Sequence, residues 1–287
     1  MPDAASLSVA LVTHAALPGG APDDRLLAAA LAREGVAVRF AVWSDDRLDW
    51  SASALTLVRS TWDYHRQPQA WRRWLAGTAA ATRLLNPPEL LAWNTDKRYL
   101  RELGRARIPC VPTCFVDAAD VPAALALPWD DLIVKPAVAA SASGVRRFTG
   151  TLQREAAASY AGQLAARGGV LVQPYLPAVE TARERSLVFI DGQFSHAFSK
   201  PAFNTNADGS TAVQPHRPSA AELAVARRVM AALPVPAFYA RVDLVPGDDG
   251  PLLMEAELIE PDLGLRLNDA AAVRLAQACM RRLRGLA

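Results

Sequence analysis

The stretch around which the rest of the chain is organised, residues 238–261, reads Phe238-Tyr-Ala-Arg241-Val-Asp243-Leu-Val-Pro-Gly-Asp-Asp-Gly-Pro-Leu-Leu-Met-Glu255-Ala-Glu257-Leu-Ile-Glu260-Pro261. An apolar run stands on each side of 246–251, where proline, glycine and aspartate residues gather. Apolar, β-branched segments separated by such residues are typical of two strands joined by a turn. The stretch therefore predicts a β-hairpin.

The hairpin would bring several charged side chains onto common faces. Side chains alternate between the two faces of a strand, so Glu255 and Glu257 point the same way. If the turn is centred near Asp249, Asp243 lies opposite Glu255, and directly opposed carboxylates repel each other. Mg²⁺ commonly binds between one or two carboxylates and substrate phosphates, so this pattern is consistent with a metal site. The same register places Arg241 opposite Glu257, and the alternative is an ordinary polar face on which these two neutralise each other.

The composition is that of a globular protein. Of the 287 residues, 51% are hydrophobic and 21% are charged, and the length suffices for one large domain or two to three smaller ones. The 31 basic and 29 acidic residues leave a net charge of +2, which gives no indication of a nucleic-acid-binding surface. The sequence contains neither a leader pattern nor a run of 18 apolar residues, so we expect a cytoplasmic protein that binds no membrane. Glycine-rich phosphate-binding motifs of the usual kinds are absent, so nucleotide binding would need another architecture.

The first part of the chain has the pattern of a small parallel sheet. Strands are expected at 7–13, 36–43 and 55–59, with a helix at 26–33 after the first of them. A β-α-β order favours parallel strands with helices on the faces of the sheet. Ligands of such sheets gather at the carboxyl ends of the strands.

A polar segment, Arg59-Ser-Thr-Trp-Asp-Tyr64, follows the third of these strands. Its position at a carboxyl end makes Arg59, Ser60 and Asp63 candidates for substrate contact. The alternative is a loop in which Arg59 pairs with Asp63.

Two lysines stand where a positive charge needs a partner. Asn94 or Thr95 can cap a helix predicted at 96–105, which puts Lys97 in the first turn, where a cation is unfavourable unless it faces an anion. Lys135 lies inside the apolar strand predicted at 132–136, where an unpaired ammonium is costly. A bound phosphate would satisfy both, although Lys97 by itself also fits a solvated side chain.

Taken in order, these features resemble the ATP-grasp superfamily, in particular the branch with glutathione synthetase, ribosomal-protein glutamate ligases and the D-cycloserine-forming ligases. The resemblance covers nearly the whole chain. The segments that carry it are Arg59-Ser-Thr-Trp-Asp-Tyr64, Asn94-Thr-Asp-Lys97-Arg-Tyr-Leu100, Val134-Lys135-Pro136 with Ser141-Ala-Ser-Gly144, Gln173-Pro-Tyr-Leu176, Ser186-Leu-Val-Phe-Ile-Asp-Gly192, Arg241-Val-Asp243 and Glu255-Ala-Glu257-Leu-Ile-Glu-Pro261.

The resemblance implies an α+β protein whose N-terminal part is α/β. A pre-ATP-grasp domain at 1–92, which contributes to the substrate site, would precede a small ATP-grasp lobe at 93–170. A C-terminal lobe at 171–287 would carry the metal site, and ATP would lie between the two lobes. We expect a monomer or a homodimer.

The resemblance also assigns roles to individual residues. Lys97, Lys135 and Lys200 would contact the phosphates of ATP, and Glu184 the ribose. The residues that would line the rest of the ATP site are Ser141, Ala142, Ser143 and Gly144 in a loop over the phosphates, and Gln173, Pro174, Tyr175 and Leu176 beside the adenine. Asp243, Glu255 and Glu257 would bind Mg²⁺, or Mn²⁺ in its place. Arg241 would be catalytic and would stabilise charge on the phosphate rather than pair with Glu257. Relatives often have asparagine where Glu257 stands.

The chemistry implied is that of an ATP-dependent, ADP-forming ligase that activates a small amino-acid-like substrate as a phosphorylated intermediate. In the cycloserine-forming branch the nucleophile belongs to the same molecule, so a ring forms, as in antibiotic biosynthesis. The alternatives are a ligase that joins a carboxylate to a separate amine and a nucleotide-binding module without turnover. The third arises because relatives carry an arginine in the segment 204–214, where this chain has alanine; Arg217 is a candidate substitute.

Overall fold

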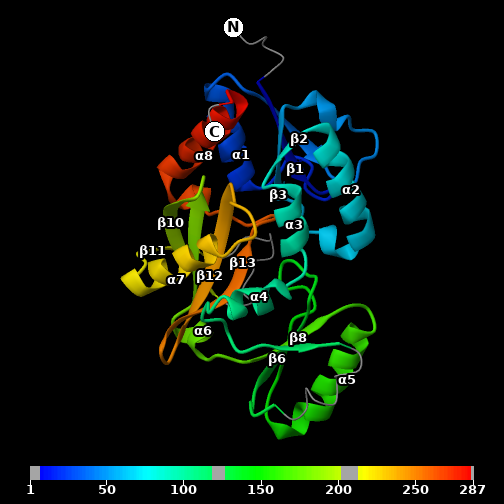
Figure 1. The fold of residues 1–287 in the computed structure, drawn as a ribbon, viewed down its shortest axis with the longest axis vertical. Coiled ribbons are helices and arrows are strands. Elements are labelled where there is room, and N and C mark those ends of the chain that lie inside the picture. The colour runs from blue at the N-terminus through cyan, green and yellow to red at the C-terminus, as the bar shows by residue number, and fades with distance from the viewer. Residues whose placement is uncertain (1–6, 118–126, 202–212, 286–287) are drawn as a thin grey trace.

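The computed structural model describes residues 7–117, 127–201 and 213–285, which form three sheets stacked along the long axis of the molecule (Figure 1). We call them the N-terminal sheet, the large sheet and the middle sheet; the last is named for its place in the chain and lies beyond the large sheet, at the lower end of Figure 1. Among the described residues, no helix combines the length and the apolar character needed to cross a membrane.

The N-terminal sheet has the parallel arrangement that the β-α-β pattern predicts. Its strand order is β2-β1-β3-β4 and all of its pairs are parallel. The strands are β1 (Ser8–Thr13), β2 (Ala37–Val42), β3 (Leu55–Ser60) and β4 (Arg83–Leu85). The helices of this part are α1 (Pro22–Arg33), α2 (Pro68–Ala81) and α3 (Pro88–Asn94).

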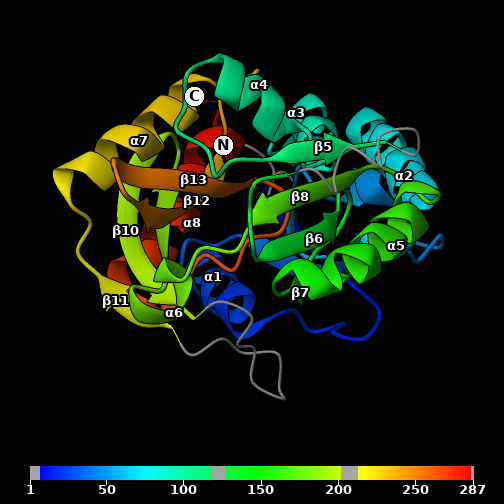
Figure 2. The same ribbon diagram turned by 90° about the horizontal axis from the view of Figure 1, so that it is seen from below.

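The middle sheet is antiparallel, with the order β5-β8-β6-β7. Its strands are β5 (Cys114–Val116), β6 (Leu132–Pro136), β7 (Arg146–Phe148) and β8 (Val170–Pro174). The amphipathic helix α5 (Arg154–Ala165) packs on it through Ala157 and Ala161 (Figure 2). Because β8 pairs with β5 and β6, the predicted lobe boundary after residue 170 falls inside this sheet rather than between two sheets.

The large sheet contains the hairpin with which the sequence analysis began. Its order is β11-β10-β9-β12-β13, and all neighbours are antiparallel. The strands are β9 (Glu184–Ile190), β10 (Gln193–Lys200), β11 (Gln214–His216), β12 (Tyr239–Gly247) and β13 (Gly250–Glu257). The helices on and around it are α6 (Ala178–Thr181), α7 (Ala220–Ala231) and α8 (Asp269–Leu283).

Local signals in the sequence account for several element boundaries. Asp191 and Gly192 both have positive φ, 52° and 73°, as a two-residue type I′ turn between β9 and β10 requires. Ser219 and Glu222 form a capping box at the start of α7, and Asn268 accepts a hydrogen bond from Ala270 at the start of α8. Short 3-10 helices occupy Trp50–Ala52, Tyr64–Arg66, Thr151–Gln153 and Leu265–Leu267.

The helix predicted at 96–105 is present but begins three residues later, at Tyr99. The chain forms α3, then a turn, then α4 (Tyr99–Arg105), and Lys97 lies in the turn. Neither predicted cap serves α4: the Thr95 hydroxyl donates to Leu91 O within the end of α3, and the Asn94 side chain bonds the backbone of β13. Proline at the first turn of α3 is a favourable start that the sequence analysis overlooked.

The two ends of the chain are joined in one core. Leu275 and Cys279 of α8 pack with Leu27 and Leu31 of α1, and the two helices lie side by side in Figure 1. The C-terminal helix therefore fastens the N-terminal sheet to the large sheet.

Candidate active site

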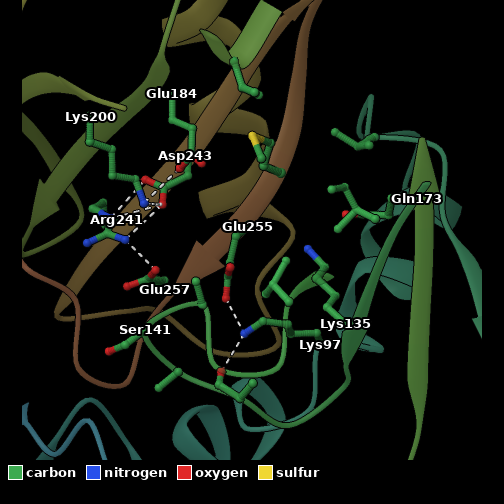
Figure 3. Close-up of a pocket in the computed structure, with 18 of the residues that line it drawn as sticks. Lys97, Lys135, Ser141, Gln173, Glu184, Lys200, Arg241, Asp243, Glu255 and Glu257 are labelled. Carbon is green, nitrogen blue, oxygen red and sulfur yellow. Dashed lines mark hydrogen bonds and ion pairs between the residues drawn. The ribbon is translucent and has the colours of Figure 1, made fainter. Parts of the chain in front are cut away.

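A cavity of about 420 Å³ lies where the three parts of the molecule meet. This volume is within the range of about 300–1,000 Å³ that is usual for small-molecule sites. The large sheet supplies Arg241 and Asp243, the middle sheet supplies Lys135 and Gln173, and the segment after β3 supplies Trp62. Figure 3 shows charged side chains of both signs converging on this space.

The hairpin has the register that opposes two carboxylates. Asp243 pairs with Glu255, and Arg241 pairs with Glu257. A bulge at Met254 makes this possible, because Leu244 pairs with Leu253 while Asp243 pairs with Glu255. Met254 and Glu255, although consecutive, both line the cavity.

Asp243 is the most heavily bonded carboxylate of the site. It is 1% exposed and accepts hydrogen bonds from Arg241 Nε at 3.0 Å, Lys200 Nζ at 2.9 Å and Ser186 Oγ at 2.7 Å. Burial by itself would raise the pKa of Asp243, but Arg241 and Lys200 hold it well below its usual range. Asp243 is therefore ionised in the folded protein. Lys200, one of its partners, also pairs with Glu184 at 3.0 Å.

Arg241 forms the ion pair with Glu257 that the sequence analysis had set aside. Its Nη2 bonds Glu257 Oε1 as well as Asp243 Oδ2, and its Nη1 donates to Asp262 O at 3.0 Å. Burial and the neighbouring Asp243 and Glu255 outweigh Arg241 and raise the pKa of Glu257 to about 7. The expectation that Arg241 does not pair with Glu257 is wrong for this structure, in which the register puts both carboxylates against the guanidinium. That Arg241 contacts phosphate stays a prediction.

Lys97 and Lys135 lie on the side of the cavity opposite Lys200 and Arg241 (Figure 3). Lys97 Nζ contacts Glu255 Oε1 at 2.5 Å and donates to Ala139 O at 2.9 Å. Burial disfavours the ammonium of Lys97, but Glu255 raises its pKa above the usual value. The anion that Lys97 needs is thus Glu255 in this structure.

Lys135 is 8% exposed and forms no hydrogen bond or ion pair with another described residue. Burial lowers its pKa.

The predicted ATP-site residues mostly line this one cavity. Those that do are Lys97, Lys135, Ser141, Ala142, Gln173, Pro174, Tyr175, Leu176, Glu184 and Lys200. Ser143 and Gly144 are not among the lining residues, although Ser141 and Ala142 of the same loop are, both with positive φ. The lining brings these residues together; that they bind ATP stays a prediction.

The structure does not support substrate contact by Arg59, Ser60 or Asp63, none of which lines the cavity. Arg59 is 2% exposed and pairs with Asp24 at 3.1 Å, so the alternative pairing with Asp63 is also absent. The Ser60 hydroxyl donates to Thr13 Oγ1, and Asp63 accepts from Trp43 Nε1. Because these three groups hold the N-terminal part together, the neighbouring Trp62 and Tyr64 supply the wall of the cavity.

Sequence reasoning gave no role to Glu260, which also lines the cavity. β13 ends at Glu257, so strand alternation could not predict the direction of a side chain three residues later. Burial and the nearby Glu257 raise the pKa of Glu260 to about 8. The only hint was its place as the third carboxylate of Glu255-Ala-Glu257-Leu-Ile-Glu260.

The donor set has the right chemistry for magnesium. Mg²⁺ prefers carboxylate oxygens, and Asp243, Glu255 and Glu257 all present such oxygens to the cavity. Within the described ranges, no three His, Cys, Asp or Glu side chains converge closely enough to hold a metal ion. The intervening cations are Lys97, Lys200 and Arg241, each bonded to one or two of these carboxylates.

The segment 204–214, with alanine in place of the expected arginine, lies outside the described residues except for its last two positions. The proposed substitute, Arg217, is exposed and is not among the residues that line the cavity.

Comparison with known proteins gives consistent matches. Residues 9–86 match the model of the N-terminal domain of the D-cycloserine synthetase DcsG. The chain is 33% identical over 270 residues to the cycloserine biosynthesis protein DcsG of Streptomyces lavendulae, with 87% of this chain and 90% of that protein covered.

Solved structures extend these matches to the whole fold. A crystal structure of D-cycloserine synthetase DcsG superposes with a TM-score of 0.86 at 32% identity, covering 96% of this chain and 99% of the other. A RimK domain ATP-grasp protein from Sphaerobacter thermophilus has a TM-score of 0.70 at 21% identity, covering 94% and 98%. D-alanyl-alanine synthetase A from Vibrio cholerae also has a TM-score of 0.70, at 14% identity, covering 98% of each chain. The last two matches show the fold alone.

Proposed function

Because this chain belongs to the D-cycloserine synthetase family and is an ATP-dependent ligase of the ATP-grasp fold, we propose that it closes a small amino-acid-like molecule into a ring at the expense of ATP. The two relatives named for cycloserine support a product of that type. A cytoplasmic location is part of the same proposal.

The observation that carries the proposal is the charge arrangement of the cavity. Three lysines and one arginine reach it from the middle sheet, the large sheet and the turn before α4, around two opposed carboxylates. A triphosphate needs such cations, and a divalent ion needs such carboxylates. Phosphoryl transfer asks a protein mainly for positioning and for neutralisation of charge, which this arrangement can supply.

Each group has a part in this proposal. Asp243, Glu255 and Glu257 would hold Mg²⁺, which when bound neutralises charge on the β- and γ-phosphates. Lys97, Lys135 and Lys200 would bind the phosphates, and Arg241 would stabilise the charge that develops during transfer. The residues proposed to enclose the nucleoside are Gln173, Pro174, Tyr175, Leu176 and Glu184.

The proposed reaction has two steps. A carboxylate oxygen of the substrate attacks the γ-phosphorus of ATP. The bond between the γ-phosphorus and the β–γ bridging oxygen breaks, ADP departs, and the substrate becomes an acyl phosphate. A nitrogen of the same molecule then attacks the carbonyl carbon, loses its proton, and expels inorganic phosphate. D-cycloserine is a ring of this kind, and opening its amide bond gives a serine-like acid with nitrogen on the side-chain oxygen. We therefore propose a substrate with an aminooxy side chain, or one with a ureido side chain. In the ureido case ring closure leaves a carbamoyl group on the ring nitrogen, and water must remove it as carbon dioxide and ammonia to give a ring of the cycloserine type.

The test is ADP release with single and paired substrates. Aminooxy and ureido derivatives of D-serine are expected to support ADP release when each is the sole amino acid, with a ring as product. Release that requires two different amino acids would instead indicate a peptide-forming ligase. Chelation of divalent ions is expected to stop the reaction, and Mn²⁺ to restore it.

The carboxylate variants provide the matched controls. Asp243→Asn and Glu255→Gln should each lower ADP release by at least about 100-fold, because transition-state charge would lose its neutralisation. Asp249→Asn makes the same chemical change at the exposed turn of the same hairpin and should leave ADP release unchanged. Undiminished ADP release by the Asp243→Asn protein would refute the proposed metal site.

A further inference from the structure

Most charged side chains that line the cavity already have partners. The pairs are Lys97 with Glu255, Lys200 with Glu184 and Asp243, Arg241 with Asp243 and Glu257, and Asp262 with Arg266. Two lining side chains, Lys135 and Glu260, form no ion pair or hydrogen bond with another described residue. One lysine and one carboxyl group without a side-chain partner therefore remain for a ligand.

The two unpaired groups belong to different walls. Lys135 lies on β6 of the middle sheet, whose neighbouring strand β8 ends at the predicted adenine connector. Glu260 follows β13 and meets the N-terminal part, where Trp62 Nε1 donates to Glu260 O at 3.2 Å. This contact holds the backbone of Glu260 beside Trp62, which also lines the cavity. The Glu260 wall thus combines a carboxylate and an aromatic ring.

The proposed substrate carries a positive charge that the residues proposed to bind ATP do not neutralise. Ring closure uses the carboxylate and a side-chain nitrogen, so the α-ammonium keeps its positive charge throughout the reaction. Burying an ammonium without an anion is costly, and an aromatic face adds attraction for it. The other cavity carboxylates are bonded to lysine or arginine.

We propose that Glu260 binds the α-ammonium of the substrate and makes the enzyme selective for acids with a free amino group. This inference rests on the proposed function and deepens it. An ammonium beside Glu260 favours the ionised carboxylate, because a nearby opposite charge stabilises the charged form. Glu260 is then a specificity-determining residue that takes no part in the transfer of phosphate.

The first test separates the two substrates kinetically. Glu260→Gln should raise KM for an aminooxy- or ureido-D-serine substrate by at least about tenfold and leave KM for ATP within about twofold. Glu34→Gln makes the same change on the exposed surface and should alter neither value. A fall in kcat at unchanged KM would overturn the proposal, because it would indicate a chemical role for Glu260.

The second test uses binding, so it does not depend on turnover. D-serine and D-glycerate differ only in the ammonium, which is a hydroxyl in D-glycerate. With Mg²⁺ and a non-hydrolysable ATP analogue, D-serine should raise the melting temperature of the wild type more than D-glycerate does. Glu260→Gln should abolish that difference while keeping the shift caused by the nucleotide, a result that general damage to the cavity would not produce.

The outcomes of the two tests are distinguishable. If no aminooxy or ureido acid supports ADP release but D-serine is still preferred over D-glycerate through Glu260, the proposed ring closure fails and the ammonium site stands. Equal stabilisation of the wild type by the two acids, or none by either, overturns the ammonium site whatever the reaction.

Discussion

At the scale of single residues, Lys135 shows how a charge in the wrong place indicates a ligand. Its neighbours Val134 and Ile133 are buried, and the ammonium itself has no ion-pair partner among the described residues. Burial lowers the pKa of Lys135, which means that keeping the buried ammonium charged reduces the stability of the fold. A cost of this kind is expected where binding supplies the missing partner.

Replacement of Lys135 should separate stability from binding. Lys135→Met keeps the length of the side chain and removes the charge, so the free energy of unfolding should rise by about 1 kcal/mol, or roughly 2–4 °C in melting temperature. ATP affinity, measured by calorimetry, should fall at least about tenfold. Arg73→Met, on the exposed face of α2, is the control for both quantities. Unchanged ATP affinity would exclude Lys135 from the nucleotide site.

At the scale of elements, side chains form hydrogen bonds with the backbone N–H and C=O groups at the outer edge of β13. Asn94 accepts from Leu258 N and donates to Ala256 O, and the Tyr99 hydroxyl both accepts from Ala256 N and donates to Ala256 O. These side chains form hydrogen bonds with backbone groups that would otherwise stay without a partner on an edge strand. They also fix the strand that carries Glu255 and Glu257.

The hydrogen bonds of Asn94 should contribute more to the free energy of unfolding than an ordinary helix cap does. Asn94→Ala leaves a buried N–H and a buried C=O with fewer partners, at about 1–3 kcal/mol for each group. We expect urea unfolding to show a loss of about 2–4 kcal/mol. Asn268→Ala removes the cap of α8 and should cost only about 1 kcal/mol. Equal losses would mean that Asn94 contributes no more than an ordinary cap.

At the scale of the whole molecule, two arginines, the buried Arg59 and the exposed Arg266, join the N-terminal part to the segment after β13. Arg59 bonds Asp24 through Nε and Pro261 O through Nη2, and Arg266 bonds Asp23 at 3.0 Å. The same segment contains Asp262, whose carbonyl accepts from Arg241. The position of the cavity wall therefore depends on contacts between residues about 200 positions apart.

Arg59 should behave as a structural residue. Arg59→Met leaves the Asp24 carboxylate buried without its cation, which should lower the free energy of unfolding by about 3–5 kcal/mol. Adding Asp24→Asn should recover most of that loss, because the uncompensated charge is removed. Thermal unfolding measures both effects. A large rise in substrate KM for folded Arg59→Met protein, at unchanged stability, would restore the original prediction of substrate contact.

Features that depend on neighbouring residues could be predicted from the sequence alone. The β9–β10 turn follows from Asp191-Gly192, the start of α7 from its capping box, and the hairpin from two apolar runs around a glycine-rich turn. Most charged residues that meet in the cavity, although not Glu260, were also predictable, since a carboxylate pair and a lysine within an apolar strand each need a partner. These signals are local, so a single sequence contains them.

The partners of several groups depend on long-range folding instead. The bulge at Met254 sets the register that opposes Asp243 and Glu255, and turn residues alone do not specify a bulge. Asn94 bonds β13 instead of capping α4, and Arg59 pairs with Asp24 instead of lining the cavity, because folding brings distant backbone and charge to them. A polar side chain forms hydrogen bonds with donors or acceptors within about 3 Å, and for these residues those partners are distant in sequence.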